Sequence, residues 1–257
     1  MKKIELITDE HNSYFMREAF NTLRTNILFS GKEVKSIVVT SCMAHEGKTT
    51  ISFETSRSLA ESGKRVLLID ADLRKSVMAA RLTKERGITG LSQLLSGQIA
   101  TEQAIYNTQI EGLDVIFAGP YPPNPTELVG STAFKELLSS QRDNYDYIIV
   151  DAPPLGLVID AAVMASACDG SIIVVNTGHI KYRTAQSVKE QLEKSGCKIL
   201  GVVMNQIDRK RGVTNSDSYY YSSKYGYGSG YYAYESHSNQ KSVRPDTSNV
   251  RPRSKKK

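Results

Sequence analysis

The sequence predicts an α/β fold built on a doubly wound, mostly parallel β-sheet. Short apolar runs alternate five or six times with segments of helical period, and the connections between them are short. The apolar runs do not alternate with polar residues, which is typical of strands that are buried on both faces. Acidic and amide residues follow the ends of several runs, where sheets of this kind bind their ligands.

The expected elements extend from residue 13 to residue 205. We expect strands at residues 37–39, 65–70, 113–117, 147–151, 171–175 and 199–205. We expect helices at residues 13–29, 49–63, 91–95, 134–142, 160–167 and 184–194. The first helix has an apolar stripe at Met16, Phe20, Leu23 and Ile27, with Ser13 as its N-cap. The proline-rich residues 119–125 predict a turn.

A different kind of sequence begins at residue 209. Residues 219–234 contain eight of the chain's 14 tyrosines, mixed with glycine and serine and with almost no aliphatic residues. Such a segment has no core to bury, so it is predicted to be disordered. The predicted organisation is one domain at residues 1–208, with its N-terminal helix at about 13–29, and a basic, tyrosine-rich tail at 209–257.

The net charge of +6 is unevenly distributed along the chain. The tail contains 11 Lys/Arg and 3 Asp/Glu, whereas the remaining residues contain 22 Lys/Arg and 24 Asp/Glu. The basic character therefore belongs to the tail, and it does not predict that the folded domain binds nucleic acid.

The composition also bears on the compartment. The longest apolar runs are too short to cross a bilayer, and Glu5 and Asp9 interrupt what would be the apolar core of a signal peptide. The three cysteines lie far apart in the sequence, which favours a reducing compartment and gives no metal-binding spacing. We therefore expect a cytoplasmic location.

The first chemical motif follows the strand at residues 37–39. After that strand come small and polar residues, then Gly47, Lys48 and Thr49 at the start of a helical segment. A strand, a loop and a helix that begins at Gly-Lys-Thr form the context of a phosphate-binding loop. Lys48 would contact the β- and γ-phosphates, and the Thr49 hydroxyl would bind Mg²⁺. The alternative is an ordinary strand-to-helix turn with an exposed lysine.

Aspartates follow two of the buried strands. Asp70 and Asp72 end one strand, and Asp151 ends another. A buried lone carboxylate is costly, so each must be hydrated, paired or bound to a metal, and near a phosphate-binding loop the simplest partner is Mg²⁺. The alternative is a set of strand-end caps with a salt bridge to Arg74. Asn205, which ends the last strand, could contact adenine or form a turn.

On these motifs the chain resembles the bacterial tyrosine kinases of capsule and exopolysaccharide synthesis, which build kinase activity on a P-loop ATPase fold. The resemblance covers roughly residues 13–234. It is carried by Glu-Gly-Lys-Thr-Thr at 46–50, Val-Leu-Leu-Ile-Asp-Ala-Asp-Leu-Arg-Lys at 66–75, Ala-Gly-Pro-Tyr-Pro-Pro-Asn-Pro-Thr-Glu-Leu at 118–128, Asp151 and the tyrosine cluster.

The resemblance implies ATP and Mg²⁺ as cofactors and assigns roles to specific residues. The implied catalytic residues are Lys48, Asp70, Asp72 and Asp151, and the implied metal ligands are Thr49, Asp70 and Asp151. The implied nucleotide contacts are Cys42, Met43, Ala44, His45, Glu46, Gly47, Lys48, Thr49, Thr50, Arg74 and Asn205. The implied phosphate acceptors, modified by a neighbouring subunit, are Tyr219, Tyr220, Tyr221, Tyr225, Tyr227, Tyr231, Tyr232 and Tyr234.

The resemblance also implies partners. They are a membrane-anchored activator whose cytoplasmic segment completes the nucleotide site, a cognate phosphotyrosine phosphatase, and further copies of the chain in a ring that uses Glu18 and Arg24. A location at the inner face of the cell membrane would follow from the activator. The family usually has Pro-Gly where this chain has Ala44-His45, and an arginine where it has Asn21. Asn21 lacks the charge and the two-pronged donor geometry of arginine.

Two other functions fit parts of the sequence. A partition or septum-positioning ATPase shares the phosphate-binding loop and both aspartate segments, but it usually has a lysine at the position of Met43 and no tyrosine-rich tail. A catalytically weak scaffold for polysaccharide assembly would account for Ala44 and His45.

Overall fold

The computed structural model describes residues 2–8 and 14–207. The predicted N-cap Ser13, residue 208 and the predicted tail at 209–257 lie outside the described residues.

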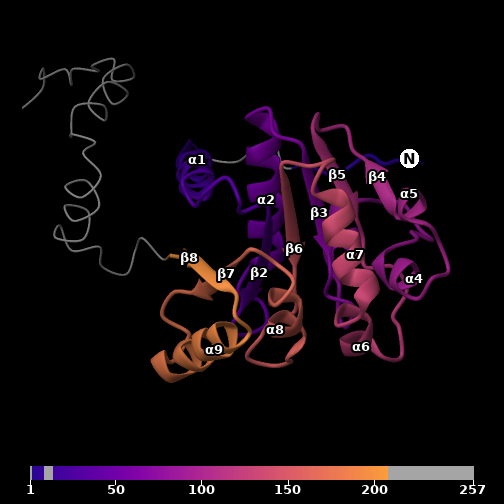
Figure 1. The fold of residues 1–257 in the computed structure, drawn as a ribbon. Helices are drawn as coiled ribbons and strands as arrows, with labels where there is room; N and C mark the ends of the chain where they lie inside the picture. The colour runs from indigo at the N-terminus through magenta and orange to yellow at the C-terminus, as the bar shows by residue number, and fades with distance from the viewer. Residues whose placement is uncertain (1, 9–13, 208–257) are drawn as a thin grey trace, which may run out of the picture. The chain divides into compact units, whose positions relative to one another are not determined.

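The core of the domain is an eight-stranded sheet with the strand order β1-β4-β5-β3-β6-β2-β7-β8 (Figure 1). The strands are β1 (Lys2–Lys3), β2 (Ser36–Ser41), β3 (Val66–Asp70), β4 (Ile105–Asn107), β5 (Leu113–Ile116), β6 (Tyr147–Asp151), β7 (Gly170–Asn176) and β8 (Lys198–Asn205). Neighbouring strands are parallel except for the antiparallel pair β4–β5. The predicted mostly parallel sheet is therefore confirmed.

Helices follow the strands in the way expected of a doubly wound fold. They are α1 (Tyr14–Leu28), α2 (Lys48–Glu61), α3 (Met78–Leu82), α4 (Leu91–Leu95), α5 (Thr101–Ala104), α6 (Pro125–Val129), α7 (Thr132–Gln141), α8 (Asp160–Ala165) and α9 (Tyr182–Lys194). All six predicted helices and all six predicted strands are present, with ends that differ by a few residues.

The alternation of side chains along the strands divides the core into two apolar layers. In β2, Val38 packs in the layer formed by α4–α9, whereas Ile37 and Val39 pack in the layer formed by α1–α3. In β3, Leu67 and Ile69 likewise face the first layer, and the neighbouring residues face the second. Every residue of β2, β3 and β6 is buried, which explains why each of these strands contains an apolar run that no polar residue interrupts, at 37–39, 66–69 and 147–150.

Five short elements were not predicted: β1, β4, α3, α5 and α6. β4 has three residues, so it is too short to show a period. α6 begins at Pro125, within the segment that was expected to be only a turn. Proline is favoured in the first turn of a helix because its missing N–H has no helical partner there.

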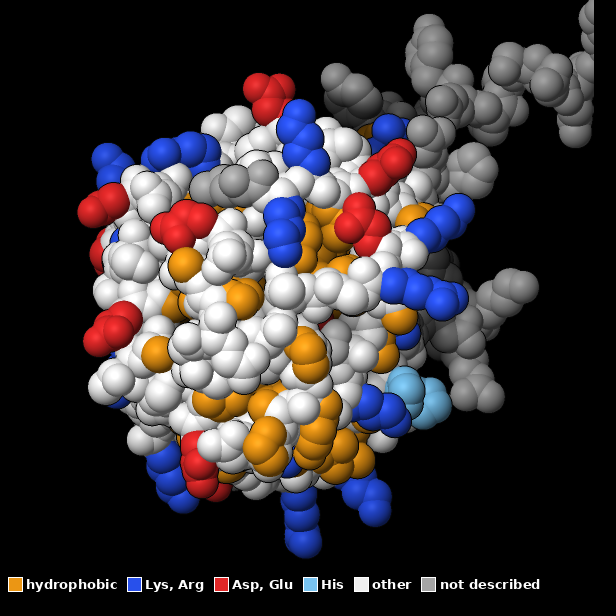
Figure 2. Space-filling model, turned by 90° about the vertical axis from the view of Figure 1, so that its right-hand side faces the viewer, with side chains coloured by type: hydrophobic (Ala, Val, Ile, Leu, Met, Phe, Trp, Pro, Cys, Tyr) orange, Lys and Arg blue, Asp and Glu red, His pale blue; other side chains and the backbone are white. Residues whose placement is uncertain are grey.

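Charged side chains of both signs are interspersed on the face of the molecule that contains β4, α4 and α5 (Figure 2). Small apolar areas lie between them. This mixed surface agrees with the nearly balanced charge of residues 1–208.

Candidate active site

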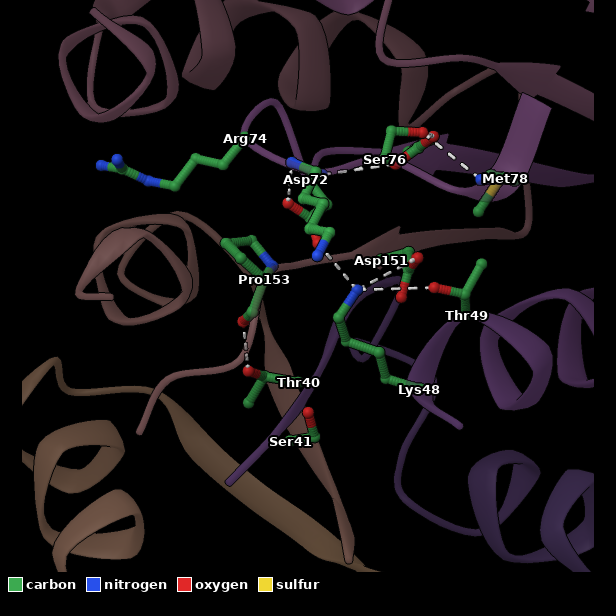
Figure 3. Close-up of polar contacts among 12 residues, drawn as sticks. Thr40, Ser41, Lys48, Thr49, Asp72, Arg74, Ser76, Met78, Asp151 and Pro153 are labelled. Atoms are coloured by element: carbon green, nitrogen blue, oxygen red, sulfur yellow. Dashed lines mark hydrogen bonds and ion pairs between the residues drawn. The ribbon is translucent and has the colours of Figure 1, made fainter. Parts of the chain in front are cut away.

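The candidate site lies at the carboxyl ends of three adjacent strands in the order β3, β6, β2. Lys48 and Thr49 form the start of α2, after the loop that follows β2 (Figure 3). Asp70 ends β3, Asp72 lies in the turn after it, and Asp151 ends β6. All five residues are buried. The structure therefore brings together the five residues that the sequence predicted to carry the chemistry.

Lys48 occupies the centre of this group. Its Nζ lies 3.0 Å from Asp72 Oδ2, 3.8 Å from Asp151 Oδ2 and 3.4 Å from the Thr49 hydroxyl. Burial alone would lower the pKa of Lys48, but the charges of Asp151 and Asp72 outweigh burial and raise it above the ordinary value. Lys48 is thus a buried, charged lysine and not the exposed one of the alternative interpretation.

Asp151 is fixed by donors from α2. Ser52, one helical turn after Lys48, donates its hydroxyl to Asp151 Oδ1 at 3.1 Å. Burial raises the pKa of Asp151, although Lys48, Thr49 and Ser52 oppose that rise. Sequence reasoning missed Ser52, although its position on the Lys48 face of α2 was a usable signal.

Asp70, like Asp151, has a pKa above the ordinary carboxyl value. Burial, together with repulsion from Asp151, raises the pKa of Asp70 to about 7, while a hydrogen bond from Ser76 and the charge of Lys48 oppose the rise. The Ser76 hydroxyl donates to Asp70 Oδ2. The backbone N–H of Asp72 contacts Asp70 Oδ1 at 3.3 Å, and the backbone N–H of Lys75 donates to Asp72 Oδ1 at 3.0 Å. These contacts hold both carboxylates in a tight turn after β3.

This group of residues fits a magnesium-bound polyphosphate. Three buried carboxylates face one lysine, so negative charge is in surplus. Repulsion from Asp151 adds to burial in raising the pKa of Asp70. Within the described ranges, no three His, Cys, Asp or Glu side chains are arranged to hold a metal by themselves. Mg²⁺ typically takes only one or two carboxylates, and phosphate oxygens and waters complete its shell. The donor set therefore suits a metal that arrives with its nucleotide.

The phosphate-binding loop is held in shape by Glu46. The buried carboxylate of Glu46 accepts hydrogen bonds from the backbone N–H of Met43 at 2.6 Å and from the backbone N–H of Asn176 at 2.8 Å. Asn176 ends β7, so the loop is tied to the neighbouring strand. Asn176 Oδ1 is itself buried without a hydrogen-bond partner in the described part of the chain. Sequence reasoning missed Asn176, although it follows a predicted strand as Asn205 does.

Asn205 and Gln206 support the same loop from β8. Asn205 Nδ2 donates to the Glu46 carbonyl at 2.9 Å, and Gln206 Nε2 donates to the His45 carbonyl at 3.1 Å. A Cβ on Gly47, which has φ 89°, would lie 2.2 Å from Asn205 Nδ2. Gly47 is therefore required both by its backbone conformation and by the close approach of Asn205.

The remaining predicted loop residues occupy two environments. The Cys42 side chain is buried in the core, and burial raises the pKa of its thiol to about 11, so it is a neutral apolar group. Met43, Ala44, His45 and Thr50 are exposed. His45 has φ 64°, in the left-handed region where glycine is favoured and histidine is tolerated. The loop thus keeps a glycine-like conformation at the position where the family usually has glycine.

Arg74 points away from Lys48 (Figure 3). Its Nε lies 2.7 Å from Asp160 Oδ2, and its terminal nitrogen donates to the Thr126 hydroxyl at 2.7 Å. Thr126 also donates to Asp160 Oδ1 at 2.7 Å. Arg74 forms its salt bridge with Asp160, at the start of α8, and not with the strand-end aspartates of the alternative interpretation. The contact of Arg74 with nucleotide stays a prediction.

The two predicted interface residues lie on α1. Arg24 donates to the Ser58 carbonyl at 3.1 Å and to the Ser58 hydroxyl at 3.0 Å, so it joins α1 to α2. Glu18 accepts from Asn21 at 3.1 Å. Their role between subunits stays a prediction. The predicted phosphate acceptors between residues 219 and 234 lie outside the described residues.

Two further observations bear on the setting. No helix in the described residues is long and apolar enough to span a membrane. Cys42, Cys168 and Cys197 are free thiols.

Comparison with known proteins identifies the family. A family model described as an AAA domain matches residues 34–195. The tyrosine-protein kinase CpsD of Streptococcus agalactiae is 42% identical over 209 residues, which cover 81% of this chain and 91% of the relative. The tyrosine-protein kinase CpsD of Streptococcus pneumoniae is 44% identical over 207 residues, which cover 80% and 88%. YwqD of Bacillus subtilis, also named a tyrosine-protein kinase, is 37% identical over 209 residues, which cover 80% and 86%.

Solved structures give the same result. The kinase domain of the Escherichia coli tyrosine kinase ETK matches with a TM-score of 0.74 at 31% identity, over 80% of this chain and 81% of that one. The septum site-determining protein MinD of Pyrococcus horikoshii matches less well, with a TM-score of 0.60 at 27% identity, over 69% and 72%. The kinase interpretation is therefore favoured over the septum-positioning and scaffold alternatives. The chain belongs to the family of bacterial tyrosine-protein kinases that are built on a P-loop AAA domain.

Proposed function

We propose that this protein transfers the γ-phosphoryl group of ATP to tyrosine hydroxyls in a magnesium-dependent reaction. The observation that carries the proposal is the position of Lys48, a buried phosphate-loop lysine held between Asp72 and Asp151 from two adjacent strands. A lysine at this position can bind phosphate oxygens. The carboxylates around it can bind a metal ion and an acceptor hydroxyl.

The binding roles follow from the contacts. Lys48 and the backbone N–H groups at the start of α2 bind the phosphates. Asp151 and Thr49 are the proposed metal holders, because they are close together and Ser52 orients Asp151. When bound, Mg²⁺ neutralises charge that develops on the phosphates.

The acceptor roles belong to Asp70 and Asp72. One of these carboxylates orients the phenol and takes its proton while the phenol oxygen bonds to phosphorus. The bond from phosphorus to the bridging oxygen breaks, and its electron pair leaves with ADP. Asn205, through its contact with the loop at Glu46, positions the phosphate-binding backbone.

The proposed acceptors are the eight tyrosines from Tyr219 to Tyr234, phosphorylated by a neighbouring subunit. Replacement of all eight by Phe should remove most ATP-dependent labelling of the chain. Undiminished labelling would show that the acceptors lie elsewhere.

The proposed partners are those of a capsule or exopolysaccharide system. They comprise a membrane-anchored activator that would hold the protein at the inner face of the membrane, a phosphotyrosine phosphatase, and other copies of the chain that meet at Glu18 and Arg24. Several relatives named tyrosine-protein kinases support this setting, among them one in a cps region of Klebsiella pneumoniae.

The test uses the full chain with labelled ATP and Mg²⁺, with and without the activator's cytoplasmic segment. Phosphotyrosine should form in the wild type and disappear in Lys48→Ala. Lys32→Ala, which removes an exposed lysine, is the matched control and should keep full labelling. ATP hydrolysis without phosphotyrosine would identify a switch ATPase instead, and nucleotide binding with neither activity would identify a scaffold.

A further inference from the structure

Three side chains from separate segments form a closed set of hydrogen bonds beside the candidate active site. Arg74 lies in the turn after β3, Thr126 lies in α6, and Asp160 begins α8. Arg74 Nε donates to Asp160 Oδ2 at 2.7 Å, and a terminal nitrogen of Arg74 donates to Asp160 Oδ1 at 3.2 Å. The same terminal nitrogen donates to the Thr126 hydroxyl at 2.7 Å, and Thr126 donates to Asp160 Oδ1 at 2.7 Å. Each of the three side chains thus contacts the other two.

The partner of Arg74 is a buried carboxylate. Asp160 is only 2% exposed, so its charge requires donors inside the protein. The planar guanidinium of Arg74 meets both carboxylate oxygens, and charge-assisted bonds of this kind are about twice as strong as neutral ones. Without Arg74, Thr126 is the one side chain that still donates to Asp160 in the described part of the chain. The pair therefore anchors the turn after β3 firmly to α8.

The backbone beside Arg74 orients the carboxylate of Asp72. The N–H of Lys75 belongs to the peptide bond that joins Arg74 to Lys75, and it donates to Asp72 Oδ1 at 3.0 Å. Lys48 contacts the other oxygen, Oδ2, at 3.0 Å. A bound polyphosphate draws Lys48 toward phosphate oxygens, and the Lys75 N–H then remains to orient Asp72. The position of that N–H depends on where the Arg74 side chain is anchored.

We propose that Arg74 is a positioning residue for tyrosine transfer, which acts by fixing the turn that carries Asp72. The inference rests on the proposed function, in which Asp70 or Asp72 orients the acceptor hydroxyl and takes its proton. In this role Arg74 touches neither ATP nor the acceptor, and its anchors on α6 and α8 set the direction of Asp72 through the Lys75 N–H. A misplacement of about 1 Å at such a carboxylate can cost on the order of a hundredfold in rate.

The direction of the Arg74 side chain separates this role from contact with the nucleotide. Its guanidinium points away from Lys48 (Figure 3). A nucleotide contact would require Arg74 to leave Asp160, and the buried carboxylate would then lose its cation. The two roles also differ in kinetics. Loss of a nucleotide contact weakens nucleotide binding, whereas loss of a positioning residue slows transfer from the bound complex.

The test separates binding from transfer in the full chain. Arg74→Lys keeps the charge but removes the two-pronged donor, so it should lower kcat for phosphorylation of a tyrosine-containing peptide by about tenfold to a hundredfold. The Kd of Mg-ADP, measured by titration calorimetry, should stay at the wild-type value. Arg183→Lys makes the same change at an exposed arginine of α9 and should keep wild-type kcat. A weaker Kd that accounts for the lost activity, or wild-type kcat in Arg74→Lys, would overturn the proposal.

A pair of Thr126 variants tests whether the effect is only a general loss of stability. Thr126→Ser keeps the hydroxyl that joins Arg74 to Asp160 and should keep wild-type kcat. Thr126→Val has the size of threonine without that hydroxyl, so it should lower kcat and leave Mg-ADP affinity unchanged. Melting temperatures establish that each variant is folded at the assay temperature. Equal kcat in the two Thr126 variants would overturn the positioning role alone, whereas absence of phosphotyrosine in the wild type would overturn the proposed function itself.

Discussion

Lys48 Nζ and Asp72 Oδ2 lie 3.0 Å apart, although 24 residues separate them in the sequence, and both side chains are buried. The pair joins the start of α2 to the turn after β3. The lysine that would meet a phosphate therefore already has a carboxylate partner. Binding of a polyphosphate must replace that partner, and the carboxylates around the lysine oppose the incoming negative charge.

The first prediction concerns Asp72→Asn. This change removes one buried negative charge and releases Lys48 from its closest partner. Binding of ADP without Mg²⁺ should become tighter, on the order of tenfold, which corresponds to about 1.4 kcal/mol. Titration calorimetry measures the change, and Asp143→Asn, which removes an exposed carboxylate, should leave the affinity unaltered. Weaker binding in Asp72→Asn would contradict this electrostatic account.

The second prediction concerns Lys48→Met. This change leaves Asp70, Asp72 and Asp151 without their buried cation, and breaking a buried ion pair typically costs about 3 kcal/mol. The folded carboxyls would then bind more protons than the unfolded ones, so stability falls as pH rises. Denaturant unfolding should show a larger loss at pH 8 than at pH 6. An equal loss of stability at both pH values, or a comparable loss in Lys32→Met, would contradict the explanation by unpaired carboxylates.

The third prediction concerns the raised pKa of Asp70, about 7. Because the ordinary carboxyl value lies near 4, the wild type loses stability as pH rises between these two values. Asp70→Asn removes that penalty, so the nucleotide-free variant should be more stable at pH 8 by about 1 kcal/mol. The gain should shrink as pH falls and vanish below about pH 4, where both the folded and the unfolded wild type are protonated at this site. Thermal unfolding of the wild type and Asp70→Asn measures the stability difference at each pH. Tyrosine transfer by Asp70→Asn should fall at least about a hundredfold.

The fourth prediction concerns His45, whose φ of 64° is strained for a side chain with a Cβ. His45→Gly should stabilise the protein by about 0.5–1 kcal/mol, because glycine adopts this conformation without steric cost. His45→Val should destabilise it, since a β-branched residue fits the left-handed region poorly. Thermal unfolding of both variants distinguishes backbone strain from a side-chain role. Loss of stability in the glycine variant would point to a contact of the imidazole.

The fifth prediction concerns Asp169, which holds the start of β2. Its carboxylate accepts from the backbone N–H groups of Lys35 and Ser36 and from Arg142 at 2.7 Å. Burial opposes ionisation, but the donors of Ser36, Arg142 and Lys35 outweigh it and lower the pKa of Asp169. Asp169→Asn should cost about 2 kcal/mol at pH 7.

The sign of the pH dependence follows from that lowered pKa. The contribution of Asp169 is complete above the ordinary carboxyl value near 4 and is lost as pH falls through the lower folded value. Unfolding curves of wild type and Asp169→Asn should therefore approach each other as pH falls below about 4. A constant difference across this range would exclude the charge as the cause.

Local patterns predicted the main framework of the fold because each central strand is buried on both faces. That burial gives β2, β3 and β6 uninterrupted apolar runs at 37–39, 66–69 and 147–150, which are visible without a structure. The edge of the sheet was less predictable. β1 and β4 contain two and three residues, and their pairing depends on contacts between residues about 100 positions apart. A local pattern of apolar residues cannot predict a pairing between such distant segments.

The candidate site likewise contains features that the sequence could predict and features that it could not. Lys48, Asp70 and Asp151 were predictable because strand ends of a parallel sheet share one edge. The partner of Arg74 was not, because Asp160 is 86 residues away and lies at the start of a different helix. The tie between Glu46 and Asn176 spans 130 residues and uses a backbone N–H, which carries no sequence signal.

The sequence by itself determined which residues bear charge and hydroxyl groups and that they follow buried strands. Only the tertiary structure decided their partners: Lys48 with Asp72, Arg74 with Asp160, and Asp70 with Ser76. The physical reason is the separation along the chain over which each interaction acts. Strand and helix propensity act over a few neighbouring residues, whereas an ion pair or a cavity wall requires positions that only the packed chain brings together.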